Sequence, residues 1–253
     1  MTWCATAQVT APGHLNSPTL LGHSRWLSVV DLPDIGSEKF CRMQWHYRIP
    51  TSSLSEREIA RYQRQQQRAG VRLLLKSLLN KLDIIDNLDD SSFPYRLVNS
   101  QYYVCFSHTG AHNKSTHSKM IATQRKNEKL SNDLNDKVAV VISAHRPAGI
   151  DIEANNVAWQ VAQRFYHTNE IAILQTLSTI ERNSAAKLLW QIKESVIKIH
   201  QYKLAQGLGM DYSYLITDLV NRNNEKTSLI VINDTTSNYH IALLFFQQTV
   251  IVY

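Results

Sequence analysis

The chain has 253 residues, of which 43% are hydrophobic and 19% charged, and its formal net charge is +6. This composition is typical of a globular protein, and no stretch approaches the roughly 20 apolar residues of a membrane-spanning helix, so we expect no membrane contact. The 3 cysteines, Cys4, Cys41 and Cys105, include no close pair, which argues against a disulfide framework or a thiolate metal site. A reducing cytoplasm is therefore the expected location. The positive charge favours an anionic partner, namely a nucleotide, a nucleic acid or an acidic protein.

The first part of the chain predicts one strand and one long helix. Residues 1–25 are rich in Thr, Ser, Pro, Gly and His, and we expect a flexible N-terminal segment there. Trp26–Leu32 is predicted as a strand. A helix then begins near Ser55, which has the side chain of a cap, and runs to about Leu82.

Arginines recur along this helix at intervals of three and four residues. At about 100° per residue, this spacing gathers them on one side of the helix. Such a surface is either a solvated basic face or an anion-binding site, and the sequence leaves both open. The arginine stripe consists of Arg57, Arg61, Arg64, Arg68 and Arg72.

A strand predicted at Gln101–Phe106 leads directly into Ser107 and His108. A hydroxyl beside an imidazole is one arrangement for nucleophilic catalysis, although no acid that would orient the imidazole is identifiable. His112 and His117 follow closely, so a histidine metal site is a further alternative, without the spacing of a strong zinc motif.

The middle of the chain separates two halves. Residues 112–136 are polar and without periodicity, and are predicted as a long loop that is either disordered or a partner-contacting insert. Lys137–Ser143 is an apolar strand, and the break at Ala144–Pro147 marks a hinge. We therefore divide the chain into an N-terminal half, residues 26–145, and a C-terminal half, residues 146–253.

Gly149–Glu153 reads GIDIE and predicts a strand with two acidic side chains on one face. Ile150 and Ile152 point to one side, and Asp151 and Glu153 point to the other. Two carboxylates on one face repel each other unless solvent or a cation separates them. A divalent cation such as Mg²⁺ is commonly held by a few carboxylates, waters and substrate phosphates.

Trp190–Leu208 carries a helical apolar pattern with polar residues on the opposite side, and we expect this helix to end near Gln206. Glu194 and Lys198 are four residues apart and leave the same face of the helix. A surface ion pair is the ordinary interpretation. The alternative is that Glu194 adds a third carboxylate to the acidic pair of the strand.

Further elements complete the prediction. A helix capped by Asn155 or Asn156 carries Arg164–Tyr166, and another begins at Thr168 or Asn169 and runs to about Leu177. Such alternation of strands and helices in both halves predicts an α+β fold. Four strands are predicted near the C-terminus, at Tyr212–Thr217, Ser228–Ile232, His240–Phe246 and Thr249–Tyr253.

Several motifs occur in the order seen in one enzyme family. They are Phe106–Thr109 (FSHT), Gly149–Glu153 (GIDIE), Arg164–Tyr166 (RFY) and Trp190–Lys198 (W-x-x-K-E-S-x-x-K). Together they resemble the 4′-phosphopantetheinyl transferases, over roughly residues 54–208. The resemblance implies two similar α+β halves that form a pseudo-twofold monomer with the site at their interface.

The resemblance also implies a reaction. These enzymes move the 4′-phosphopantetheine group of coenzyme A onto a serine of an acyl or peptidyl carrier protein and release adenosine 3′,5′-bisphosphate. Coenzyme A is the co-substrate, Mg²⁺ is the cofactor, and no nucleic acid or membrane takes part. Fatty-acid, polyketide and nonribosomal peptide synthesis all use such carriers.

Residue roles follow from the positions that match the family motifs. Asp151, Glu153 and Glu194 are the implied Mg²⁺ ligands, and Glu194 is the implied base for the carrier serine. The implied phosphate contacts are Lys193 and Lys198, and the implied wall of the site is Trp190.

Coenzyme A contacts are implied in the N-terminal half. Ser107 and His108 match the residues that hold the 3′-phosphate, and Arg72 and Arg57 match basic residues that contact the nucleotide. Phe93 stands where the family has a lysine, so one phosphate or adenine contact is missing. Two alternatives stay open: a nucleic-acid-binding protein that uses the arginine stripe, and a degenerate family member that binds coenzyme A without turnover.

Overall fold

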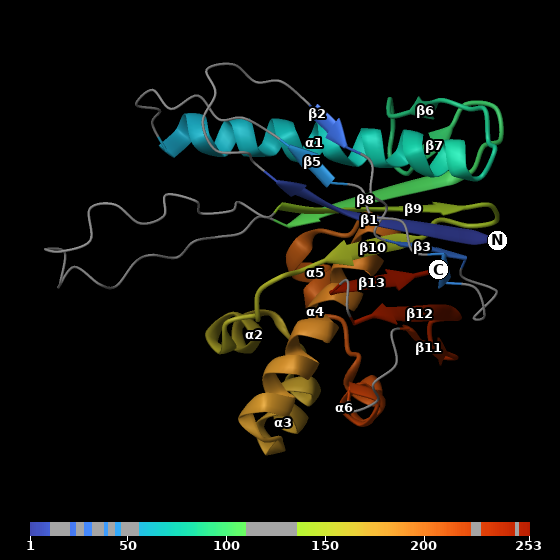
Figure 1. Cartoon of the computed structure of the whole chain (residues 1–253). Coiled ribbons are helices and arrows are strands. Elements are labelled where there is room, and N and C mark those ends of the chain that lie inside the picture. The colour runs from blue at the N-terminus through green and yellow to red at the C-terminus, as the bar shows by residue number, and fades with distance from the viewer. Residues whose placement is uncertain are drawn as a thin grey trace, which may run out of the picture.

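The structure is a computed structural model with an α+β fold built on two sheets (Figure 1). The helix α1 (Glu56–Lys81) lies on one side of the first sheet, and the second sheet lies on the other side. Further helices cover the outer face of the second sheet. The described residues are 1–10, 21–23, 28–31, 38–39, 44–46, 56–109, 136–223, 229–245 and 248–253.

The first sheet has the strand order β2-β5-β1-β9-β8-β7-β6, with β3 paired to β1 and β4 paired to β3. Its pairs are antiparallel except β1 with β5. The strands are β1 (Thr2–Thr10), β2 (Leu21–His23), β3 (Ser28–Asp31), β4 (Glu38–Lys39), β5 (Gln44–His46), β6 (Leu88–Asp89), β7 (Tyr95–Leu97), β8 (Tyr103–Thr109) and β9 (Asp136–Ser143).

The beginning of the chain corrects one expectation. Residues 2–10 form β1 and pair with β9, so they are not the flexible segment predicted for residues 1–25. The threonine-rich composition suggested mobility, but Cys4, Ala5 and Ala7 are buried in the sheet. The helix predicted up to Leu82 is confirmed by α1, which ends at Lys81.

The second sheet is antiparallel, with the order β10-β13-β12-β11. The predicted strand of the GIDIE motif is confirmed as β10. The elements of this half are β10 (Gly149–Ile152), α2 (Trp159–Phe165), α3 (Thr168–Thr176), α4 (Thr179–His200), α5 (Leu204–Leu208), η1 (Ser213–Leu215), α6 (Ile216–Asn223), β11 (Leu229–Asp234), β12 (Tyr239–Leu244) and β13 (Thr249–Val252).

The two sheets share a hydrophobic core. Cys4 and Cys105 of the first sheet pack in the same cluster as Ile150 and Ile152 of β10. The isoleucines of the GIDIE motif therefore face the first sheet, as their alternation predicts. On the opposite face of the second sheet, buried residues of α4 form a separate core with β11, β12 and β13.

Several predicted boundaries in this half are wrong. The residue Ser178 caps α4, which ends at His200 because Gln201 adopts a left-handed conformation with φ 57°. The segment predicted to continue as one helix becomes the separate helix α5. Neither predicted asparagine caps α2, which follows Ala158, and α3 is capped by His167.

Ser213–Thr217 is helical, although alternating side chains predicted a strand over Tyr212–Thr217. Tyr212, Leu215, Ile216 and Leu219 are buried, which is a spacing of three and four residues and places them on one helical face. The short apolar stretch fits both the two-residue period of a strand and the 3.6-residue period of a helix, and packing against α4 selects the helix. None of the helices in the described parts of the chain has the length and apolar character needed to span a membrane.

Gly149 allows β10 and α4 to approach closely. A Cβ atom at this position would lie 2.0 Å from the carbonyl oxygen of Ser195, which is backbone and cannot move without shifting α4. We expect Gly149→Ala to lower the free energy of unfolding by about 1–3 kcal/mol, the usual cost of overpacking. Urea unfolding measures this loss. Gly209→Ala is the matched control, because its Cβ would lie 3.2 Å from the nearest atom and should cost less; an equal loss in both variants would contradict the close approach.

Candidate active site where β8, β10 and α4 meet

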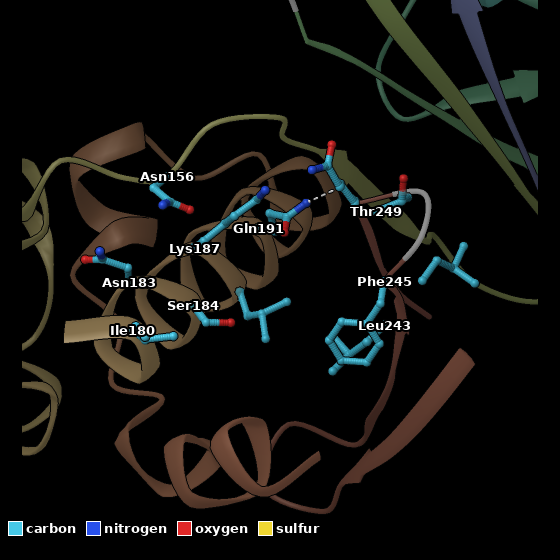
Figure 2. Close-up of a pocket in the computed structure, with 12 residues that line it drawn as sticks. Asn156, Ile180, Asn183, Ser184, Lys187, Gln191, Leu243, Phe245 and Thr249 are labelled. Carbon is cyan, nitrogen blue, oxygen red and sulfur yellow. Dashed lines mark hydrogen bonds between the residues drawn. The ribbon is translucent and has the colours of Figure 1, made fainter. Parts of the chain in front are cut away.

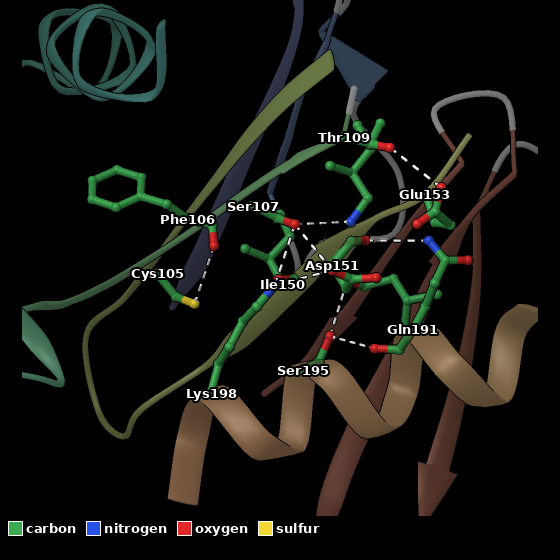
Figure 3. Close-up of polar contacts among 12 residues, drawn as sticks. Cys105, Phe106, Ser107, Thr109, Ile150, Asp151, Glu153, Gln191, Ser195 and Lys198 are labelled. Atoms are coloured by element: carbon green, nitrogen blue, oxygen red, sulfur yellow. Dashed lines mark hydrogen bonds and ion pairs between the residues drawn. The ribbon is translucent and has the colours of Figure 1, made fainter. Parts of the chain in front are cut away.

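A buried polar network joins three elements at the edge shared by the two sheets (Figure 3). The Lys198 Nζ of α4 lies 3.0 Å from Asp151 Oδ1 of β10 and 3.2 Å from Ser107 Oγ of β8. It also donates to the carbonyl oxygen of Ile150 at 2.7 Å. Because these groups come from both sheets and from α4, the network fixes all three elements relative to one another.

Ser107 is fully engaged within this network. Its hydroxyl donates to Asp151 Oδ1 at 3.0 Å and accepts from the backbone N–H of Ile152 at 3.2 Å. Only 4% of the residue is exposed. The resemblance implies a contact between Ser107 and the 3′-phosphate, but here its hydroxyl connects the sheets. Because the hydroxyl is buried and already bonded to groups of β10 and α4, it is also a poor candidate for the alternative of a nucleophile.

The ammonium of Lys198 is stabilised in its protonated form. Burial lowers the pKa of this ammonium, but the Asp151 carboxylate and other neighbours outweigh burial, and the net pKa is raised. The side chains of Lys198 and Asp151 are 23% and 11% exposed. The ion pair is therefore largely removed from water, in contrast with the exposed Glu194–Lys198 pair that the helix spacing suggested.

Glu194 is half-buried beside this ion pair. Burial raises the pKa of its carboxyl, Asp151 and Glu153 raise it further, and Lys198 opposes them. The three acidic side chains singled out in the sequence therefore interact electrostatically. A raised pKa makes Glu194 a stronger base than an ordinary carboxylate.

Glu153 lies at the end of β10 and is held by two donors. The Thr109 hydroxyl donates to Glu153 Oε1 at 3.3 Å, and the Asn155 backbone N–H donates to the same oxygen at 2.9 Å. Within the described ranges, no three His, Cys, Asp or Glu side chains are already gathered as a metal-binding group. The shared charge of Asp151, Glu153 and Glu194 is nevertheless the donor chemistry that suits a hard divalent cation.

His108 is exposed beside the network, on the opposite side of β8 from Ser107. The surrounding protein removes water from part of the imidazole, and this partial burial lowers its pKa. The positive charges of Lys198 and Arg68 lower the pKa further, whereas Asp151 raises it. Arg68 is thus the member of the arginine stripe whose charge acts on the site. The resemblance pointed to other positions of α1 and did not identify Arg68.

The side chains of the arginine stripe are all exposed, as a solvated basic face requires. Arg72 forms an ion pair with Asp90 and donates to the carbonyl oxygen of Arg68 at 3.3 Å. It also lines a pocket of about 490 Å³ with Lys76 and Leu79, between α1 and residues 84–90. In this arrangement Arg72 is already paired, and nothing among its contacts connects it to Lys198 or Glu194.

Lys193 differs most from its predicted role. Its side chain is 0% exposed, and its ammonium contacts the Glu170 carboxylate rather than the polar network around Lys198 and Asp151. This position follows from the helix itself, because at about 100° per residue position 193 lies between the buried Ala186 and Leu189 around the axis of α4. Trp190 is half-buried against Tyr166, with ring centroids 6.4 Å apart.

Phe93, at the position where the resemblance implies a lysine, makes an aromatic contact instead. Its ring meets Tyr95 edge-on with centroids 5.2 Å apart. The Gln201 amide donates to the carbonyl oxygen of Phe93 at 2.8 Å, which ties the end of α4 to this turn. His112, His117 and the insert predicted at residues 112–136 lie outside the described residues, apart from residue 136 in β9.

A pocket of about 460 Å³ lies against the N-terminal part of α4 (Figure 2). The Gln191 amide is among its lining groups and donates to the carbonyl oxygens of Asp151 at 3.4 Å and Gln248 at 2.7 Å. Lys187 donates to the carbonyl oxygen of Ala154 at 3.4 Å. Residues 187, 191, 194 and 198 share one helical face, so the spacing of Glu194 and Lys198 could have identified the other two.

Residues 147–245 match the family model of the 4′-phosphopantetheinyl transferase superfamily. The match contains Asp151, Glu153, Glu194 and Lys198, and it confirms the resemblance given by the motifs. No curated protein matches the chain.

Replacement of Lys198 tests the buried ion pair. Lys198→Met leaves the Asp151 carboxylate without its cation, and we expect the free energy of unfolding to fall by about 3 kcal/mol, the lower end for breaking a buried pair. Because the folded-state pKa of Lys198 is raised, this stabilisation is present below the ordinary lysine pKa and is lost as the pH rises through the raised value. Urea unfolding at neutral and alkaline pH measures both effects.

The control for this test is Lys203→Met, which removes an exposed lysine from the same half. It should change the free energy of unfolding by less than about 0.5 kcal/mol. A loss below about 1 kcal/mol for Lys198→Met would instead indicate an ordinary solvent-screened pair.

Proposed function

Starting from the assignment of residues 147–245 to the 4′-phosphopantetheinyl transferase superfamily, we propose that the chain moves 4′-phosphopantetheine from coenzyme A to a serine of a carrier protein. The by-product is adenosine 3′,5′-bisphosphate. The observation that carries this proposal is the position of Glu194 and Lys198 on one face of α4, beside Asp151. We include in the proposal that the chain is a monomer of two similar halves, with α1 and α4 as corresponding helices.

Magnesium is part of the proposal because the acidic groups suit it. The charges of Asp151 and Glu153 raise the pKa of Glu194, and the single positive charge of Lys198 opposes them. These three carboxylates would hold the cation. When bound, Mg²⁺ neutralises negative charge on the pyrophosphate oxygens of coenzyme A.

Glu194 is the base of the proposed reaction. The carrier serine must lose a proton as its oxygen attacks phosphorus, and the Glu194 carboxylate, on the face of α4 beside Asp151, would accept that proton. The new bond joins the serine oxygen to the phosphorus of phosphopantetheine. The bond that breaks joins this phosphorus to the bridging oxygen of adenosine 3′,5′-bisphosphate.

Lys198 acts on the leaving group through its charge. Since the pKa of its ammonium is raised, Lys198 remains protonated and stabilises the departing phosphate rather than giving it a proton. Positioning and electrostatics supply most of the catalysis of phosphoryl transfer, so no covalent enzyme intermediate is needed.

Coenzyme A binding is assigned to the groups that face α1. His108 and Arg68 lie on the same side of β8 and act electrostatically on one another, which suits a 3′-phosphate. Arg57 and Arg72 remain candidate nucleotide contacts, and Arg72 would first have to leave Asp90. The pathway served, whether fatty-acid, polyketide or nonribosomal peptide synthesis, depends on the carrier.

One observation favours the alternative of coenzyme A binding without turnover. Arg72 is paired with Asp90 and Phe93 replaces the family lysine, so the nucleotide side departs from the family pattern. The nucleic-acid alternative relies only on the exposed arginine stripe. Binding to random DNA that weakens steeply with salt would favour it.

Glu194→Gln separates a catalytic carboxylate from a surface charge. The variant keeps the shape of the side chain and removes its basicity, and we expect the initial transfer rate to fall by about a hundredfold or more. In the parent, the rate should rise with pH as the carboxylates of the base and of the metal site lose their protons. Rates are measured on one carrier at saturating coenzyme A. Asp218→Asn, an exposed carboxylate of α6, is the control; parent-like rates for Glu194→Gln would remove the proposed mechanism.

His108→Ala tests recognition of the 3′-phosphate. The variant should bind coenzyme A about tenfold or more weakly and should bind 3′-dephospho-coenzyme A like the parent, because a charge-assisted contact is worth roughly 1.5–3 kcal/mol. Titration calorimetry measures both affinities. Arg68→Ala should show the same selectivity, and equal losses for both ligands would show that this side of β8 does not contact the phosphate.

A further inference from the structure

The ion pair between Lys193 and Glu170 is fully removed from solvent. Both side chains are 0% exposed, and Lys193 Nζ lies 2.7 Å from Glu170 Oε2. The ammonium also donates to the carbonyl oxygens of Leu208 at 2.6 Å and Met210 at 2.7 Å. All three N–H donors of Lys193 are therefore used inside the protein.

Glu170 connects this ammonium to two further segments. Its Oε2 accepts the backbone N–H of His167 at 3.0 Å, which completes the capping box of α3. Its Oε1 accepts the backbone N–H of Tyr212 at 2.9 Å. One buried pair thus holds the start of α3, the middle of α4 and the segment from Leu208 to Tyr212.

The surroundings of Lys193 leave little freedom for α4 to rotate. The ammonium lies 4.7 Å from the centre of the Tyr166 ring and 5.8 Å from that of Tyr212. Nearby, Gly207 approaches so closely that a Cβ atom there would lie 2.0 Å from the Ile197 side chain. These contacts lie on the face of α4 that points away from β10.

The rotation of α4 determines where the catalytic face points. With 3.6 residues per turn, Glu194 lies about 100° and Lys198 about 140° around the helix from Lys193. A helix held with Lys193 in the core therefore presents both other side chains to Asp151. A rotation that exposed Lys193 would move both away from it.

From this arrangement we infer that Lys193 and Glu170 are positioning residues, which lock α4 in the rotation that aims Glu194 and Lys198 at the substrate. This inference rests on the proposed transferase function. It reassigns the first lysine of the W-x-x-K-E-S-x-x-K motif from a phosphate contact to an internal support. No ligand reaches an ammonium that is fully buried and has no free donor.

A double-mutant cycle distinguishes support from phosphate contact. Lys193→Met keeps the length of the side chain and leaves Glu170 as a buried charge without its partner. Glu170→Gln added to it removes that charge and retains one amide oxygen, which can accept the backbone N–H of either His167 or Tyr212. Rescue of the first change by the second is expected only if the two residues act as a pair.

We expect Lys193→Met to lower kcat at least tenfold and to leave KM for coenzyme A within about twofold of the parent. The midpoint of urea unfolding should fall as well. In the double variant, kcat should be at least threefold higher than in Lys193→Met. The urea midpoint should also regain part of its decrease. Lys203→Met is the control and should match the parent. A tenfold rise in KM with unchanged kcat, or no recovery in the double variant, would overturn the inference.

A second measurement does not depend on the transfer reaction. In ¹H–¹⁵N spectra, the backbone signals of Glu194 and Lys198 should shift in Lys193→Met and return towards the parent positions in the double variant. If the parent transfers nothing but these signals follow the cycle, the proposed function fails and the positioning role stands. If the signals do not move in Lys193→Met, the positioning role fails whatever the activity.

Discussion

The bond from the Lys198 ammonium to the Asp151 carboxylate is the interaction on which both the fold and the site depend. It joins α4 to β10, and through Ser107 it reaches β8 of the other sheet. Charges withdrawn from water are costly unless each is paired and hydrogen-bonded, and here every contact crosses between elements. The groups that hold the two sheets together are therefore also the charged groups of the candidate site.

The helix α4 serves several tasks on its different faces. Leu189, Ile192 and Val196 pack into the core of the second sheet, and Lys193 extends into the same side to meet Glu170. The remaining polar positions of the motif face β10. The polar residues of one sequence motif thus divide into a side chain buried behind the helix and side chains that face the candidate site.

Sequence reasoning predicted the elements with a strong period and missed those decided by packing. The helix α1 and the strand carrying Asp151 followed from their patterns, and so did the closeness of Glu194 to that strand. The inward direction of Lys193 was missed because a lysine is expected at the surface, although its neighbours around the helix axis, Ala186 and Leu189, mark the buried side. The left-handed turn at Gln201 has no glycine to signal it, and the helical state of Ser213–Thr217 depends on contacts from residues distant in sequence.

The most direct test of the account is the mass of a carrier protein after incubation with this protein, coenzyme A and Mg²⁺. Several carriers in their unmodified form, each beside a variant with its acceptor serine changed to alanine, would be examined by intact-mass spectrometry. The account predicts that at least one carrier gains the mass of a single phosphopantetheine, that the alanine variant gains none, and that adenosine 3′,5′-bisphosphate appears in equal amount. Tight binding of coenzyme A with no mass gain in any carrier, under conditions where a known transferase modifies them all, would contradict it.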